Sequence, residues 1–336
     1  MQSVLALLEQ ATRVDAVAPL SEQVLLQVRD SPADAGELPV AGSSRHLLAY
    51  DGPRLAGYAH LTPALPRVPG APTEPATAEL VVAVASRRRG VARLLLGTLQ
   101  QGALDHSAVE QGALDEGTAT LQAWAHGDLP AARSLAMREG FTVVRQLWQL
   151  RRPLGDGTAR LPDAELPEGF RSRGFVVGRD EGAWLTVNAR AFAHHPEQGR
   201  ITRHDLELRQ REPWFDPAGF LLVEDVRTDP PTLAAFHWTK VHQPAPSETE
   251  QGDGAAPGEA VGEVYVLGVD PAYQGRGLAR PLTVLGVRHL QDQGLHQVML
   301  YVDSDNRALP TYVRLGFRER HVDALYVRVT SAQVPR

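Results

Sequence analysis

The sequence predicts an α/β protein of the α+β type, with a mixed sheet. It also predicts that the chain is organised as two tandem domains of the same fold. The length of 336 residues exceeds what one hydrophobic core usually organises, which favours two domains. The order strand, glycine loop, helix, strand, helix, strand also occurs once in each half of the chain. This internal repeat indicates that the two domains share one architecture.

The N-terminal copy begins with an amphipathic helix predicted within residues 1–20. Residues 79–85 form an apolar run typical of a strand, and residues 86–92 form the loop that follows it. Val91, Leu95 and Leu99 then recur at helical spacing. The copy continues with a predicted strand at 118–124, a helix at 133–139 and a strand at 141–150.

The C-terminal copy repeats this order with a strand at 264–269, a glycine loop at 274–279 and a helix whose apolar face carries Leu278, Leu282 and Leu285. A strand at 297–302, a helix at 306–314 and a strand at 317–329 follow. The last helices of the two copies end alike, with Gly140 before Phe141 and Gly316 before Phe317. Each glycine fits the left-handed position that closes a helix.

The domain boundaries follow from composition. We predict an N-terminal domain over residues 1–151, a proline- and glycine-bearing linker over 152–167, and a C-terminal domain over 168–336. Residues 243–260 are rich in Pro, Gly, Ser and Glu, and are expected to form a mobile loop between two strands. We assign no chemistry to that loop.

Composition excludes several classes of function. The chain has no cysteine, so disulfides, thiolate metal sites and a cysteine nucleophile are excluded. The net charge of −6 gives no electrostatic footprint for nucleic acid, and no apolar run is long enough to cross a bilayer. No export signal is visible near the N-terminus. We therefore expect a cytoplasmic monomer that acts on a small molecule, without nucleic acid or membrane partners.

The glycine loops predict anion binding, because unpaired backbone N–H groups and the helix dipole both favour phosphate at a helix start. A loop of this kind can also be a simple helix cap. Gln274, Gly277 and Ala279 fit the pattern Gln/Arg-x-x-Gly-x-Gly/Ala, and Arg87, Gly90 and Ala92 repeat it. This pattern resembles the pyrophosphate loop of the GCN5-related N-acetyltransferases (GNAT), and two matches in register strengthen the resemblance. Pro281 lies about one turn into the second helix and is expected to be tolerated there.

The GNAT resemblance implies that acetyl-CoA is the cosubstrate and that the strand before each loop splays from its neighbour to hold the pantetheine arm. In the C-terminal copy the implied contacts are Leu267, Gly268, Val269, Gln274, Gly275, Arg276, Gly277, Leu278, Ala279, Arg280 and Asn306. In the N-terminal copy they are Leu80, Val81, Val82, Arg87, Arg88, Arg89, Gly90, Val91 and Ala92.

Acyl transfer to an amine needs a base and an acid. Glu263, early in the strand that leads to the loop, is the candidate base, and Tyr312, where the family commonly places a tyrosine, is the candidate acid. Alignment of the two copies on their loops and phenylalanines puts Ala76 at the position of Glu263 and Ala136 at that of Tyr312. The N-terminal copy is therefore predicted to be non-catalytic. The alternative for Glu263 is a solvated carboxylate at the end of a strand, and the alternative for Tyr312 is an aromatic residue of the core.

Longer stretches are similar to the mycothiol synthase family, whose members are tandem acetyltransferases. The similar stretches are residues 17–19, 21–25, 124–127, 195–199, 214–217, 236–242, 262–270 and 301–306. The resemblance implies N-acetylation of the cysteinyl amine of cysteinyl-glucosaminyl-inositol in the C-terminal domain. It also implies an acceptor pocket formed by Glu22, Glu197, Lys240, Glu263 and Tyr301, although Glu22, Glu197 and Lys240 are equally compatible with surface charge. Ala83 and Val84 depart from the family's usual His-Pro pair, which weakens only the N-terminal cofactor site.

Two other functions fit the same motifs. One is a GNAT enzyme for another amine, such as an aminoglycoside or a protein N-terminus, and the other is a non-catalytic protein that binds acetyl-CoA. His195, His237 and His242 have no spacing that would create a shared metal-binding face, so we predict no metal.

Overall fold

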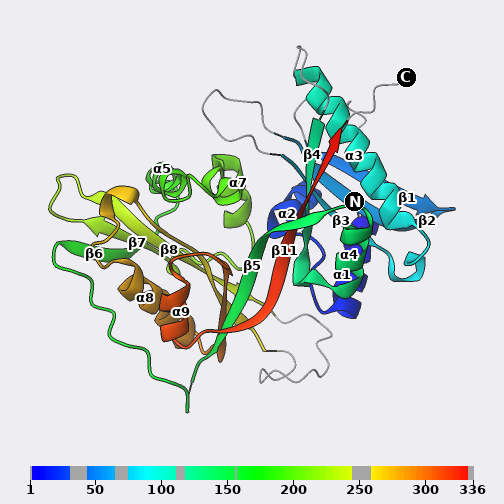
Figure 1. Cartoon of the computed structure of the whole chain (residues 1–336). Coiled ribbons are helices and arrows are strands. Elements are labelled where there is room, and N and C mark those ends of the chain that lie inside the picture. The colour runs from blue at the N-terminus through cyan, green and yellow to red at the C-terminus, as the bar shows by residue number, and fades with distance from the viewer. Residues whose placement is uncertain are drawn as a thin grey trace. The chain divides into compact units, whose positions relative to one another are not determined.

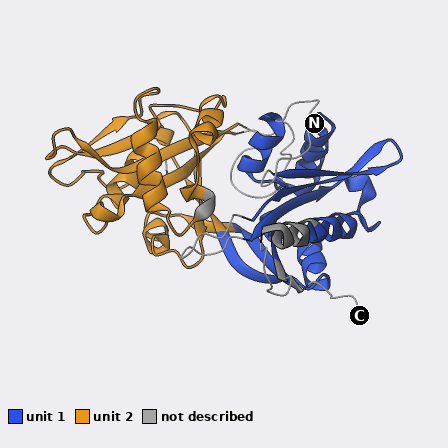
Figure 2. Cartoon of the chain, turned by 90° about the horizontal axis from the view of Figure 1, so that it is seen from above, with its two compact units in different colours: residues 1–147, 321–336 blue, residues 148–320 orange. Residues whose placement is uncertain are grey.

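The computed structural model describes residues 2–30, 44–64, 75–110, 118–155, 157–243 and 259–331. The chain folds into two compact units, which Figure 2 colours separately. Unit 1 comprises Met1–Leu147 and His321–Arg336, and unit 2 comprises Trp148–Arg320. The division near residue 148 lies close to the expected end of the first domain. The described residues 321–331 lie in unit 1, however, although we expected them in the C-terminal domain.

Unit 1 consists of a mixed sheet with helices on both faces. Its elements are α1 (Gln2–Asp15), α2 (Glu22–Asp30), β1 (Arg45–Asp51), β2 (Arg54–Thr62), β3 (Ala76–Val82), η1 (Val84–Ser86), α3 (Val91–Glu110), β4 (Thr118–Ala125), η2 (His126–Asp128), α4 (Pro130–Arg138) and the first part of β5 (Thr142–Pro153). Strands β1 to β3 pair antiparallel in sequence order, and β3 pairs parallel with β4.

Unit 2 has the same plan. Its elements are β6 (Phe170–Gly174), α5 (Glu181–Ala191), α6 (Pro196–Gly199), α7 (Arg203–Gln210), β7 (Phe220–Asp225), β8 (Thr232–His242), β9 (Val261–Val269), η3 (Pro271–Tyr273), α8 (Ala279–Asp292), β10 (Gln297–Asp303), α9 (Leu309–Arg314) and the start of β11 (Arg318–Ser331). Strands β6 to β9 pair antiparallel, and β9 pairs parallel with β10.

Two long strands carry residues of both units. Strand β5 begins in unit 1 and ends in unit 2, and β11 runs in the opposite sense and returns to unit 1. Residues 324–331 of β11 pair antiparallel with β4, so this part of β11 belongs to the sheet of unit 1 (Figure 1). A sequence repeat does not reveal such an exchange, because strand pairing is decided by long-range contacts.

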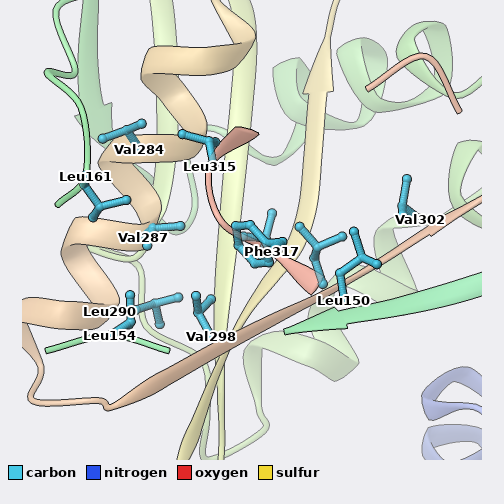
Figure 3. Packing of buried hydrophobic residues seen from close by; sticks show 12 residues of the cluster. Leu150, Leu154, Leu161, Val284, Val287, Leu290, Val298, Val302, Leu315 and Phe317 are labelled. Carbon is cyan, nitrogen blue, oxygen red and sulfur yellow. The ribbon is translucent and has the colours of Figure 1, made fainter. Parts of the chain in front are cut away.

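The core of each unit lies on the two faces of its sheet. In unit 2, Val284, Val287 and Leu290 of α8 pack against Val298 of β10 and Phe317, as Figure 3 shows. On the opposite face α5 and α7 cover an aromatic cluster of Trp184, Phe220, Phe236 and Trp238. In unit 1 the corresponding layers are α3 with α4 and α1 with α2. Helix α8 buries more of its surface than the three expected leucines, and Leu285 itself is only half-buried.

The predicted helix ends are confirmed. Gly140 and Gly316 have φ values of +75° and +91°. The Phe141 amide donates to the Ala136 carbonyl at 2.9 Å, and the Phe317 amide donates to the Tyr312 carbonyl at 3.1 Å. These matched hydrogen bonds support the alignment of Ala136 with Tyr312. Pro281 is the third residue of α8, where its missing N–H would have no intrahelical acceptor.

The predicted linker over residues 152–167 begins inside strand β5, which ends at Pro153. Beyond β5 the described residues 157–167 contain no helix or strand. Residues 244–258, which make up most of the predicted loop, lie outside the described residues, and the loop does connect strands β8 and β9. In the described part of the chain, no helix is long and apolar enough to span a membrane.

Candidate functional site

The loop between β9 and α8 forms an open cradle of backbone amides. Gly275 and Gly277 have φ values of +75° and +79°, which other residues adopt at a cost. Within the described chain, the N–H groups of residues 275–278 donate to no backbone acceptor. Apart from Gly275 itself and its two chain neighbours, no residue has an atom within 4 Å of the position that a Cβ would take at Gly275. Consecutive amides at a helix start bind phosphate groups, so this loop fits the pyrophosphate of an acyl-CoA.

The corresponding loop of unit 1 has a similar backbone. Gly90 has φ +86°, and Arg88 takes the left-handed conformation with φ +65° at the position of Gly275. The Arg87 guanidinium donates to both carboxylate oxygens of Asp15, at 2.8 and 2.6 Å. These bonds hold Arg87 on the end of α1. The N-terminal loop thus keeps its shape, while one of its three arginines is committed to an internal ion pair.

The expected splay between strands is present in both units. In unit 2, β9 and β10 pair only through Gly262, Glu263 and Val264, opposite residues 298–300. Beyond Val264, β9 continues to pair with β8 on its other edge as far as Val269. One edge of residues 265–269, which include Leu267, Gly268 and Val269, is therefore open toward the splay. An extended ligand can hydrogen-bond to such an edge as an added strand does.

A β-bulge distinguishes β9 from β3. The register between β8 and β9 shifts at Trp238/Thr239, so Tyr265 is an extra residue on β9, and no such shift occurs between β2 and β3. A gapless alignment of the two copies therefore fails on this strand. The expected equivalence of Ala76 with Glu263 is wrong, because the short ladders between β3 and β4 and between β9 and β10 align Thr77 with Glu263. The N-terminal copy still has no carboxylate at this position.

Glu263 lies on the sheet face that α5 and α7 partly cover. Its neighbour Val264 packs into the core under α8, and side chains alternate along a strand, so Glu263 points to the other face. The carboxylate is 8 % exposed, and its Oε2 accepts a hydrogen bond from His242 Nε2 at 2.6 Å. From the sequence, His242 is considered only as a metal ligand, and no metal is predicted. Lys240 and His242 are two residues apart and so share a strand face, but this spacing does not indicate that His242 contacts Glu263.

Further polar side chains surround Glu263 on this face. Lys240 is its cross-strand partner on β8, and the Lys240 Nζ lies 4.6 Å from the Trp214 ring centroid and 5.1 Å from that of Tyr265. Tyr301 on β10 lies two residues beyond Met299, the partner of Glu263, and is 38 % exposed. We name Lys240, His242, Glu263 and Tyr301 the polar face of unit 2. Three predicted site residues thus lie on the same face of the sheet.

Tyr312 lies on the other side of the sheet, in α9. Its ring packs at the edge of the core under α8 and meets the Phe317 ring edge-on, with centroids 6.0 Å apart. Burial raises the pKa of Tyr312 to about 12. The phenol is therefore protonated throughout the neutral range and can act as a hydrogen-bond donor.

The remaining predicted residues belong to other elements. Glu22 is the first residue of α2 in unit 1, whereas Lys240, Glu263 and Tyr301 belong to unit 2. Glu197 lies in α6, and its side chain lies outside the described residues. The Asn306 Oδ1 accepts the Ala308 N–H at 2.8 Å, which shapes the turn before α9. A CoA contact of Asn306 remains a prediction.

The three histidines considered for a metal have different partners. His195 pairs with Asp303 at 3.5 Å, and His242 pairs with Glu263. His237 is buried beside α8, where its Nδ1 lies 2.9 Å from the Leu282 carbonyl, and burial lowers its pKa to about 4. Among the described residues, no group of three or more His, Cys, Asp or Glu side chains is arranged to hold a metal ion.

Unit 1 contains a charged cluster that the sequence analysis missed. His126 lies between Asp323 of β11 and Glu79 of β3, with nitrogen to oxygen distances of 3.2 and 3.3 Å. Burial alone would lower the pKa of His126, but hydrogen bonds to Asp323 and Glu79 outweigh it and raise the pKa to about 10. Glu79 also accepts a hydrogen bond from the Ser21 hydroxyl at 2.7 Å. This cluster connects strands β3 and β11 at the end of β4.

Comparisons with known proteins agree with this geometry. The acetyltransferase (GNAT) family matches residues 188–317. The mycothiol acetyltransferase of Thermobispora bispora is 47 % identical over 97 % of this chain and 95 % of its own length. That of Thermomonospora curvata is 48 % identical over 97 % of this chain and 93 % of its own. A tandem GNAT protein from the clavulanic acid biosynthesis pathway has a similar structure, with a TM-score of 0.63 at 18 % identity over 99 % of this chain and 95 % of that chain.

Proposed function

The chain belongs to the mycothiol acetyltransferase family, and we propose that it transfers the acetyl group of acetyl-CoA to the cysteinyl amine of cysteinyl-glucosaminyl-inositol. It is an acyltransferase of the GNAT type, and such enzymes use an acyl-CoA as cosubstrate. We further propose that unit 2 carries out the chemistry, with residues 168–320 as its main part. The observation that carries this proposal is the carboxylate of Glu263 at the opening of the β9/β10 splay.

The cosubstrate site is proposed at the loop of residues 274–280 and the open edge of β9. The amides of residues 275–278 would hold the pyrophosphate, and those of residues 267–269 would hold the pantetheine arm and polarise the thioester carbonyl. Fixed backbone donors of this kind stabilise the oxyanion of the tetrahedral intermediate without reorganising. Asn306 is proposed to contact CoA from the turn before α9.

The amine must lose a proton before it can attack. Glu263 is proposed to accept that proton, directly or through one water, because it is a nearly buried carboxylate beside the splay. The amine nitrogen then forms a bond to the carbonyl carbon, and the carbon–sulfur bond breaks. Tyr312 is proposed to donate its hydroxyl hydrogen to the leaving thiolate, and to be reprotonated by the second proton that the nitrogen loses as the neutral amide forms. Lys240 and Tyr301 would bind the polar acceptor on the same face as Glu263, and Glu22 and Glu197 remain proposed acceptor contacts.

The N-terminal copy is proposed to be non-catalytic. Thr77 stands at the position of Glu263, and Ala136 stands at that of Tyr312, so both proton-transfer groups are absent. The loop of residues 87–92 and the strand residues 80–82 keep the backbone of a CoA site, and they are proposed to bind acetyl-CoA without turnover.

The test is a direct assay of acetylation. Purified protein is incubated with acetyl-CoA and the cysteinyl pseudodisaccharide, and the product is detected by mass spectrometry, because the acceptor's own thiol would interfere with thiol reagents. We expect an acetylated amine, and a Glu263→Gln variant with kcat/KM lower by roughly 10²- to 10⁴-fold. Glu207→Gln on the surface of α7, which makes the same chemical change, should match the wild type.

The same assay separates the alternatives. Faster acetylation of an aminoglycoside or a peptide N-terminus would change the acceptor but keep the reaction. Tight binding of acetyl-CoA without turnover of any amine would refute the proposed enzyme function. Equal activity of wild type and Glu263→Gln would leave the function standing and refute Glu263 as the base.

A further inference from the structure

The hydrogen bond between His242 and Glu263 is not explained by packing. His242 is the last residue of β8, and its side chain is 36 % exposed, whereas the Glu263 carboxylate is 8 % exposed. The 2.6 Å distance to Oε2 is within the range of charge-assisted bonds. A nearly buried carboxylate beside the proposed acyl-transfer site is thus joined to the solvent side by one imidazole.

From this geometry we infer that His242 is a positioning residue for the proposed base. His242 Nε2–H holds Oε2 of Glu263, which leaves Oε1 as the oxygen that accepts the proton of the acceptor's ammonium group. This inference rests on the proposed function. It adds a residue to the reaction and gives that residue a second effect, because an imidazole, unlike an amide, can gain a proton and become a cation.

The charge of the imidazole alters the base. When His242 is neutral, it orients the carboxylate without adding charge. When it is protonated, it places a cation against Glu263, which makes the carboxylate a weaker base and repels the incoming ammonium. The activity should therefore decrease when the imidazole is protonated.

Other charged or titratable groups lie on the same face. Lys240 is the cross-strand partner of Glu263 on β8. Arg209 donates from Nε to the Tyr265 hydroxyl at 2.7 Å, and Arg151 donates from Nη1 to Gln297 at 2.9 Å. The groups on this face of the described chain that can carry or change charge are Arg151 of β5, Arg209 of α7, His242 and Lys240 of β8, Glu263 and Tyr265 of β9, Tyr301 and Asp303 of β10, and His195, which pairs with Asp303.

The test compares the pH profiles of the wild type and His242→Gln in the acetylation assay. The glutamine amide can still donate a hydrogen bond, but it cannot be protonated. The ionisation of the acceptor amine is common to both proteins and cancels in the ratio of their kcat/KM values. We expect the wild type to exceed His242→Gln by about tenfold at pH 8, because the more flexible glutamine side chain orients Oε2 less firmly than the imidazole does, and we expect the ratio to fall at least threefold between pH 8 and pH 5.5.

A second variant fixes the positive charge. His242→Lys places a permanent cation near Glu263 and should have low activity at every pH, with a constant ratio to His242→Gln. His289→Gln is the matched control. His289 belongs to α8, away from the polar face, and pairs with Asp216 at 2.9 Å, so this variant should keep the wild-type pH profile. A role in folding alone would lower the melting temperature without changing the shape of the profile.

A ratio that is independent of pH, or a His242→Gln protein as active as the wild type, would overturn the inference. The proposed function fails in a different way, since the wild type would then produce no acetylated amine at all. The assignment of Glu263 as base also fails separately, through an active Glu263→Gln protein.

Discussion

Replacement of His126 by glutamine should strongly destabilise unit 1. His126 is shared by Glu79 and Asp323, whose carboxylates are only 6 % and 5 % exposed. Glutamine is neutral and can donate to one of them at a time. The two buried carboxylates would then lose their common counterion, which is costly because buried charges need compensation.

Two independent considerations give the magnitude. Breaking a buried ion pair from one side typically costs roughly 3–5 kcal/mol of unfolding free energy. The rise of the His126 pKa from 6.5 to about 10 corresponds to about 5 kcal/mol, at 1.36 kcal/mol for each pKa unit. We therefore expect a loss of roughly 3–5 kcal/mol at pH 6.5.

The effect should depend on pH with a definite sign. Because the pKa of His126 is higher in the folded state, its stabilisation is complete below pH 6.5 and is lost as the pH rises to about 10. The difference between wild type and His126→Gln should therefore shrink steadily across this interval. Glu79 acts oppositely: burial alone would raise its pKa, but the bonds from His126 and Ser21 lower it, so its contribution is lost at acidic pH.

The assay must report on unit 1 alone. Native-state hydrogen exchange under increasing urea, measured on peptides from β4 and β11, gives the free energy of opening for these strands. His321→Gln is the matched control, since His321 lies 3.8 Å from the same Asp323 but is more exposed, and it should cost less than about 1 kcal/mol. A His126→Gln loss below about 1 kcal/mol, or a loss unchanged between pH 6.5 and 10, would refute this reasoning.

Three further predictions concern the proposed sites. Gly277→Ala places a side chain at φ +79° and should raise the KM for acetyl-CoA by about tenfold, at a cost of about 1 kcal/mol in unfolding free energy, and an unchanged KM would contradict the loop assignment. Tyr312→Phe should lower kcat by roughly 10²-fold at constant KM, and single-turnover kinetics would detect this; an unchanged kcat would exclude Tyr312 as the acid. Asp15→Asn should cost about 1 kcal/mol of unit 1 stability in urea unfolding by releasing Arg87, while kcat stays at the wild-type value; a fall in kcat would give the N-terminal loop a role in turnover.

Features encoded locally could be predicted from the sequence. The glycine loops, the strands before them and the helix ends at Gly140 and Gly316 depend on conformations that few residues adopt, so single positions reveal them. The repeat then doubled the evidence for each one. The placement of Lys240, Glu263 and Tyr301 on one sheet face could be anticipated only through the family resemblance.

Features created by long-range pairing could not be predicted. His126 and Asp323 are separated by 197 positions in the chain, and no periodicity connects them. The same holds for β11, which starts in unit 2 and joins the sheet of unit 1. The pairing of His242 with Glu263 across 21 positions was also missed, because two polar residues on neighbouring strands have no sequence signature that separates contact from proximity.

The bulge at Tyr265 explains why the two copies differ more than their shared motifs suggest. One extra residue on a strand reverses the facing of every side chain beyond it. On a regular strand, residues 263 and 266 would face opposite sides of the sheet. On β9 the bulge at Tyr265 puts Glu263 and Val266 on the same face, under α5 and α7. On β3, which lacks the bulge, Thr77, Glu79 and Val81 simply alternate, and the carboxylate that faces α2 is Glu79. That carboxylate is held by His126 and Ser21. In the N-terminal copy the buried acid thus stabilises the fold, whereas Glu263 of the C-terminal copy lies beside the open splay, where a base for acyl transfer is needed.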